Sequence, residues 1–243
     1  MSIWSQVHDV GALEYARTVD TPVHKEKAAR LTDYSQVEVY ENPVANLLTH
    51  STLLLSMLFW LPVVGYMLDG YTASSGMVIG LIYGLCGFVW WFVYAYHFHR
   101  LHHTEVDQKW ATSYWRRLWH FNGHGYHHMF PHDPRRIVIH PMIASCAILP
   151  TIYAGSWVAA THYRIFMAGL ILGHLFVEVV HFSLHYDTML TPYVKPLQHH
   201  HMCHHYKIPH RFFAYGHKLE DTIWTKVLGD VPMPVHKVGG SFF

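Results

Sequence analysis

The sequence predicts an all-α integral membrane protein with about four transmembrane helices and a cytosolic helical cap. The chain of 243 residues is 51% hydrophobic but only 14% charged, whereas soluble proteins contain roughly 25% charged residues. Four long segments carry almost no charged side chains. Histidine occurs 25 times, and fifteen of these residues fall in the windows 97–128 and 181–205. Membrane helices with a histidine-rich site at their ends would account for all of these features.

The first 41 residues are polar and mixed in charge. No apolar run begins near Met1, so the sequence predicts no secretory signal peptide. We interpret residues 1–41 as a cytosolic N-terminal arm and residues 42–243 as the membrane domain.

Four apolar runs follow the arm, at about 47–68, 77–98, 137–160 and 163–186. Each reaches the roughly 20 residues that a helix needs to cross a bilayer. Pro62 and Pro150 interrupt the first and third runs and predict kinks there, while Glu178 interrupts the fourth. The alternative is a soluble helical protein, but four such runs are hard to bury in so small a domain.

The distribution of positive charge predicts the orientation. Of the 17 lysine and arginine residues, only Arg164, at the tight connection of the third and fourth runs, falls on the side opposite the others. By the positive-inside rule, the side with the other charges is cytoplasmic. Both termini and the histidine clusters share that side. The predicted location is therefore a bacterial inner membrane or the endoplasmic reticulum, with the site facing the cytoplasm.

Histidine spacing identifies a candidate metal site. In two places a histidine is followed three and four positions later by an adjacent pair. Residues three and four apart lie on one face of a helix, so each triplet can direct its imidazoles to one point. Together they can enclose more than one metal ion. The two triplets are His124, His127 and His128, and His201, His204 and His205.

Two further histidine pairs lie at the ends of apolar runs. His97 and His102 end the second run, and His181 and His185 end the fourth. Ten imidazoles suit two metals, each with several nitrogen ligands, and imidazole is compatible with zinc, copper, iron or nickel. The ten predicted ligands are His97, His102, His124, His127, His128, His181, His185, His201, His204 and His205. The alternative ligands are His99, His103 and His200. The carboxylates predicted to orient imidazoles are Glu178, Asp133 and Asp187.

Other classes of function find little support. The net charge is +1 and no basic recognition helix occurs, so nucleic acid is not an expected partner. Cys86, Cys146 and Cys203 are too widely spaced to predict a disulfide framework or a zinc-binding cysteine pair. No glycine-rich phosphate loop or serine nucleophile motif is present. We therefore predict no catalytic residues beyond the metal ligands.

Residues 90–230 resemble the membrane fatty acid hydroxylase and sterol desaturase superfamily. The likeness is carried by segment 123–128, which reads Gly-His-Gly-Tyr-His-His, by 133–138 after it, and by 178–185. These segments are most similar to the fatty acid 2-hydroxylase branch. The resemblance implies a four-helix membrane anchor, a cytosolic cap, and the ten histidines above as ligands of two iron ions, which zinc can replace in a purified sample.

The resemblance also implies a function. The expected activity is O2-dependent insertion of a hydroxyl group into a fatty acyl or related lipid chain, at carbon 2. Electrons would come from a separate donor such as cytochrome b5 or ferredoxin. Three alternatives remain: a sterol or carotenoid hydroxylase, a lipid desaturase of the same superfamily, or a non-catalytic zinc-binding membrane protein.

Overall fold

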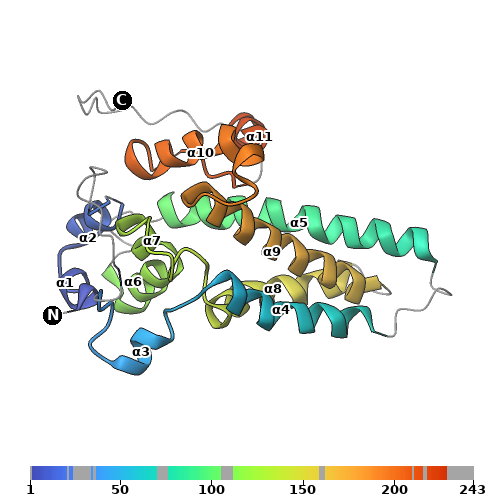
Figure 1. The fold of residues 1–243 in the computed structure, drawn as a ribbon, viewed down its shortest axis with the longest axis horizontal. Coiled ribbons are helices and arrows are strands. Elements are labelled where there is room, and N and C mark those ends of the chain that lie inside the picture. Colours follow the sequence, from blue (N-terminus) through green and yellow to red (C-terminus); the bar gives the residue numbers. More distant parts are fainter. Residues whose placement is uncertain are drawn as a thin grey trace.

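The computed structural model describes residues 2–20, 22–23, 34, 37–69, 76–104, 112–158, 162–209, 211–215 and 218–228. The described part of the chain is helical and contains no strand. The predicted all-α class is thus confirmed. Long helices lie side by side at one end of the molecule, and shorter helices gather at the other (Figure 1).

Four long helices correspond to the four apolar runs: α4 (Leu53–Leu68), α5 (Met77–Thr104), α8 (Pro141–Val158) and α9 (Tyr163–His185). Among the described residues, two segments, 77–103 and 163–185, are long and apolar enough to cross a membrane. The helix α4 is apolar but shorter. Two candidate spans are therefore observed, and four crossings stay a prediction.

The helix α9 occupies the centre of this bundle. It is mostly buried by its neighbours, whereas the apolar segment of α5 is mostly exposed. Large side chains of α5 such as Met77 and Leu81 are about 70% accessible. A row of exposed apolar side chains is typical of a lipid-facing helix.

Glycines bring α5 and α9 into close contact. A Cβ atom built on Gly169 of α9 would overlap the carbonyl group of Gly84 on α5, and one on Gly87 would overlap the carbonyl of Phe166. Small residues of this kind let two helix backbones approach closely. The histidine-bearing ends of both helices are consequently held near each other.

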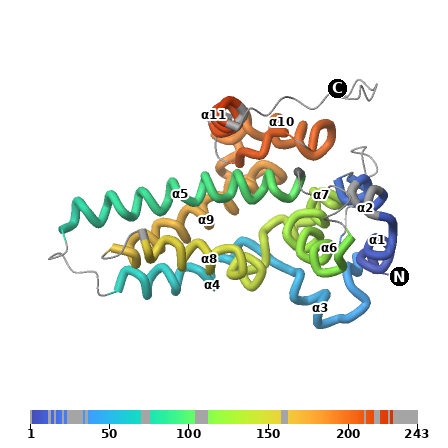
Figure 2. Tube along the Cα trace, turned by 180° about the vertical axis from the view of Figure 1, so that it is seen from behind, coloured from blue at the N-terminus to red at the C-terminus, as the bar shows by residue number. Residues whose placement is uncertain are grey.

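Shorter helices form the cap at the histidine end of the bundle (Figures 1 and 2). Its elements are α1 (Ile3–Val7), α2 (Ala12–Val19), α3 (Pro43–Leu47), α6 (Tyr114–His120), the π-helical turn η4 (Phe121–Gly125) and α7 (Tyr126–Met129). The helices α10 (Thr191–Tyr206) and α11 (Lys218–Leu228) lie over the histidine-bearing ends of α5 and α9, with α10 packed against α9. Trp4 and Tyr15 of the N-terminal arm share one core with Phe121 and Met129. The described part of the arm therefore packs as part of the cap.

Candidate metal centre

The structure brings ten buried histidines together in two groups of five. Within each group, one nitrogen from every imidazole lies within 4.8 Å of the others. The first cluster is His99, His103, His124, His128 and His204. The second cluster is His127, His181, His185, His201 and His205.

Each predicted triplet divides between the two clusters. His124 and His128, four residues apart, enter the first cluster, while His127 turns to the second. In the other triplet, His201 and His205 enter the second cluster and His204 the first. Residues four apart lie about 40° apart around a helix, whereas adjacent residues such as His127 and His128 lie about 100° apart. The two clusters are thus interlocked through α7 and α10.

The turn that carries His124 has an unusual backbone. Residues 121–125 form a π-helical turn that continues directly into α7. A Cβ atom on Gly123 would lie 2.9 Å from Nε2 of His102, and one on Gly125 would lie 3.0 Å from Nδ1 of His120. Glycine at both positions lets this turn pack tightly against the imidazoles beside it. Single π-helical turns often occur at functional sites.

The spacing of ring nitrogens matches metal coordination. In the second cluster, Nε2 of His201 lies 2.9 Å from Nε2 of His185 and 3.0 Å from Nε2 of His205. Nε2 of His127 lies 3.1 Å from that of His205. Metal–imidazole bonds are about 2.1 Å long, so two ligands at right angles place their nitrogens about 3.0 Å apart. The observed separations fit that geometry.

In the first cluster, hydrogen bonding assigns the tautomers of two rings. Nδ1 of His99 lies 2.8 Å from the carbonyl oxygen of Phe213, and Nδ1 of His204 lies 2.6 Å from that of Arg211. A carbonyl only accepts, so each Nδ1 carries the proton and each Nε2 of a neutral ring presents a lone pair. These two Nε2 atoms face each other at 3.0 Å. Two lone pairs at that distance repel unless a cation lies between them, and a metal ion fits.

Burial keeps the imidazoles neutral. Desolvation holds the pKa of His124, His127, His128, His201 and His205 well below the usual value, and neighbouring imidazoles lower each pKa further. Neutral imidazole is the form that binds metals. Nε2 of His124 is also buried without a hydrogen-bond partner in the described structure, as expected of a metal ligand.

A cavity between the bundle and the cap borders both clusters. It encloses about 1110 Å³, the space at its open mouth included. His99 and His124 of the first cluster line it, as do His127 and His181 of the second. Elsewhere its wall is mainly apolar. The apolar lining side chains are Val39, Trp91, Ala95, Phe98, Ile137, Val138, Ile139, Ile143, Ala144, Ala147 and Val177. A long apolar molecule can therefore lie along α5, α8 and α9 with one end beside the clusters.

Known proteins are similar to this chain in sequence and in fold. No family model matches the chain. It is 32% identical over 179 residues to dihydroceramide fatty acyl 2-hydroxylase FAH2 of Arabidopsis thaliana, with 71% of this chain and 70% of that protein covered. The chain belongs to the fatty acid 2-hydroxylase family. The predicted resemblance is confirmed, and because its relatives are hydroxylases, membership supports an enzymatic role.

Two further comparisons agree with that family. The ceramide very long chain fatty acid hydroxylase scs7 of Schizosaccharomyces pombe is 29% identical, with 71% of this chain and 48% of that protein covered. A solved structure of full-length scs7p, in which only the hydroxylase domain is visible, has a TM-score of 0.77 at 22% identity. That match covers 96% of this chain and 86% of the other, which shows a shared fold.

Two of the ten predicted ligands lie outside the clusters in this fatty acid 2-hydroxylase fold. The ring of His97 packs against Trp224 at 4.4 Å between centroids, and Nδ1 of His102 lies 2.8 Å from the carbonyl oxygen of Phe98. His99 and His103, the alternative ligands, take their places. Residues four apart share a face of α5, whereas residues five apart are turned about 140° from each other. The four-residue spacing also seen at 181 and 185 is the sequence signal for the pair that enters the cluster.

His200, the third alternative ligand, also lies outside both clusters. Its Nε2 is 3.1 Å from Oδ2 of Asp221 on α11. The other eight predicted ligands are all members of the clusters.

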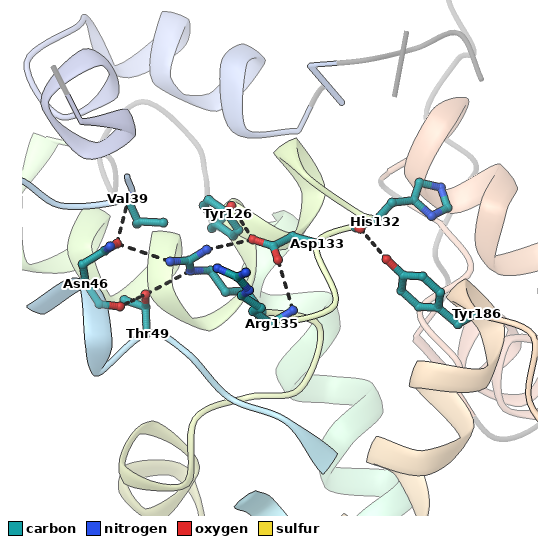
Figure 3. A network of polar contacts seen from close by, with 9 residues as sticks. Val39, Asn46, Thr49, Tyr126, His132, Asp133, Arg135 and Tyr186 are labelled. Atoms are coloured by element: carbon teal, nitrogen blue, oxygen red, sulfur yellow. Dashed lines mark hydrogen bonds and ion pairs between the residues drawn. The ribbon is translucent and has the colours of Figure 1, made fainter. Parts of the chain in front are cut away.

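The predicted carboxylates occupy other environments. Asp133 accepts hydrogen bonds from the Tyr126 hydroxyl at 2.7 Å and from Arg136 at 2.8 Å (Figure 3). This network ties the loop after α7 to α3 and its following turn, because Arg136 also donates to Asn46 and Thr49. Asp133 therefore supports the cap, and none of its hydrogen bonds in the described structure reaches an imidazole.

The remaining two predicted carboxylates differ from each other. Asp187 is exposed. Glu178 is buried on α9, lines the cavity, and lies 3.9 Å from Nδ1 of His174. It thus borders the cavity close to His181.

A carboxylate that the sequence gave no reason to select lies beside the first cluster. Oδ1 of Asp20, at the end of α2, is 3.4 Å from Nδ1 of His103. Burial raises the pKa of Asp20 to about 7. A carboxylate in this position orients the ring and increases its basicity as a ligand. The N-terminal arm therefore contributes directly to the surroundings of the metal centre.

Proposed function

We propose that this chain is an O2-dependent di-iron membrane hydroxylase that inserts a hydroxyl group at carbon 2 of a fatty acyl chain. One observation carries the proposal: two clusters of five buried imidazoles border a largely apolar cavity. The named relatives act on fatty acyl chains of dihydroceramide or ceramide, which supports an acyl lipid as substrate.

The ligand set favours iron. Structural zinc sites have four tetrahedral ligands, whereas each cluster here offers five nitrogens at separations typical of right-angled coordination. Iron with imidazole ligands and an open position suits O2 chemistry, and zinc could replace it in purified protein. When bound, the two irons would supply O2 activation, with electrons from a separate donor such as cytochrome b5 or ferredoxin.

The protein would bind and orient the substrate and exclude water. The apolar wall formed by Trp91, Ile143 and Val177 suits the acyl tail, because burying each methylene group contributes about 0.8 kcal/mol. His124 and His127 line the part of the cavity in which the reacting carbon would lie. A dry cavity also protects a reactive oxidant from side reactions.

The same arrangement supports a site at the membrane surface. The clusters lie at one end of the two apolar helices α5 and α9, and the excess of lysine and arginine on that side suggests the cytoplasm. We therefore propose four crossings, with both termini and the metal site cytoplasmic, in a bacterial inner membrane or the endoplasmic reticulum. A lipid substrate could then enter the cavity from the bilayer.

Lipid analysis tests the activity. Reduced protein with iron, O2 and a donor should convert an acyl lipid into a product heavier by one oxygen atom, with the hydroxyl at carbon 2. His127→Ala and His204→Ala should each lose metal and activity, while His8→Ala should keep both. A product lighter by two hydrogen atoms would identify a desaturase, and undiminished metal in both cluster variants would refute the ligand assignment.

A further inference from the structure

Tyr215 contacts histidines of both the first and the second cluster. Its ring stacks on His99 of the first cluster, with centroids 4.5 Å apart and planes inclined by 14°. It also meets the edge of His181 of the second cluster at 4.7 Å, and His201 lies at 5.9 Å. The phenol therefore stands where the two metals would be neighbours.

The hydroxyl of Tyr215 is available to a ligand. Tyr215 is half-buried and lines the cavity, and its hydroxyl makes no hydrogen bond within the described structure. Enclosed tyrosine hydroxyls normally find a partner. The other two tyrosines that line the cavity follow this rule, because Tyr94 donates to the carbonyl of Ala147 and Tyr126 to Asp133.

Reaction at carbon 2 places a polar group beside the metals. Carbon 2 is bonded to the acyl carbonyl carbon, so the carbonyl oxygen is only two bonds from the reacting position. Moving that oxygen from water into a largely apolar cavity is costly unless a donor meets it. The donor must therefore lie next to both clusters, a condition that the Tyr215 hydroxyl meets.

Two other donors along the cavity, Trp91 and Arg136, are less suitable. Nε1 of Trp91 is buried without a partner, but it lies two helical turns before His99, about 12 Å away along the helix axis. The guanidinium of Arg136 is already bonded to Asp133, Thr49 and Asn46. Neither combines a free donor with contact to the clusters.

We propose that the Tyr215 hydroxyl donates a hydrogen bond to the acyl carbonyl oxygen and thereby selects carbon 2 for oxidation. This inference rests on the proposed function. The carbonyl could belong to an amide or to a free fatty acid, and the hydrogen bond serves either. Tyr215 is thus a substrate-positioning residue that determines the site of hydroxylation.

Binding to the zinc-loaded protein tests the hydrogen bond without turnover. Tyr215→Phe keeps the ring that stacks on His99 and removes only the hydroxyl. Its affinity for an N-acyl amide should fall roughly three- to tenfold, the range for one hydrogen bond. Affinity for the matching alkyl amine, which lacks the carbonyl, should not change. Tyr94→Phe, which removes another hydroxyl from the same cavity, is the matched control. It should leave the ratio of the affinities for the amide and for the amine unchanged.

The identity of the carbonyl follows from a second ligand. A loss of affinity for the amide alone, for the free acid alone, or for both supports the proposal and shows which carbonyl is bound. Unchanged affinity for both ligands would refute it. Loss of metal from Tyr215→Phe would also refute it, because the hydroxyl would then belong to the metal site.

Product analysis gives an independent readout. With iron and a donor, Tyr215→Phe should form 3-hydroxy as well as 2-hydroxy products, because the acyl chain can slide along the cavity. Exclusive 2-hydroxylation by Tyr215→Phe would refute the inference while the proposed function stands. If the wild-type protein forms no hydroxylated product, the proposed function fails, and the binding experiment still decides whether Tyr215 holds the carbonyl.

Discussion

Asp20→Asn should weaken one metal site and spare the other. Asp20 lies 3.4 Å from His103, a member of the first cluster. Loss of a carboxylate behind a metal-bound histidine costs about 10- to 100-fold in metal affinity. Charge-assisted hydrogen bonds are typically about 2.7–2.9 Å long, so the longer contact here predicts the lower end of that range. We expect about a tenfold loss at the first cluster and no change at the second.

Competition with a chelator of known affinity measures this effect. The titration is made above pH 7, where Asp20, with its pKa of about 7, is ionised. The wild type should release its two metals in similar steps, and Asp20→Asn should release one of them at about tenfold lower chelator concentration. Asp187→Asn is the control, since Asp187 is exposed. Equal weakening of both sites, or an effect of Asp187→Asn alone, would contradict the assigned role.

Three further perturbations test the centre and the bundle. His99→Ala should abolish metal binding at the first cluster and product formation, whereas His97→Ala should keep both, as shown by metal content and lipid analysis. Chelation should lower the midpoint of thermal unfolding. A metal present at 1,000 times its Kd adds about 4 kcal/mol to the free energy of unfolding for each site, so an unchanged midpoint would exclude a structural role for the metal. Gly169→Ala should destabilise the detergent-solubilised protein by about 1–3 kcal/mol because its Cβ overlaps Gly84, while Gly65→Ala, with open space around it, should not.

Much of the centre could be predicted because helix geometry is local. The two triplets and the pair at 181 and 185 supplied eight cluster members. The same rule of four-residue spacing also explains why His99 and His103 belong to the first cluster. The crowding of histidines at the end of α5 left the choice between the pair at 97 and 102 and the pair at 99 and 103 open.

Other features depend on contacts between distant segments. Asp20 reaches His103 only because α2 packs against α7. The sequence around Asp20 contains no motif that predicts a contact with a metal-binding histidine. Tyr215 lies in a short segment without regular structure between α10 and α11, where no periodicity predicts its direction. The positions of both residues depend on how the cap packs against the bundle.

The candidate metal centre connects the cap with the apolar helices, because histidines from both parts form each cluster. The first cluster takes one four-residue pair from α5 and one from η4 and α7, and the second takes one from α9 and one from α10. The fifth histidine of the first cluster is His204 of α10, and that of the second cluster is His127 of α7. Neither site can therefore form unless the cap is docked on the bundle. The glycine contact between α5 and α9 holds together the two helices that carry pairs from different clusters.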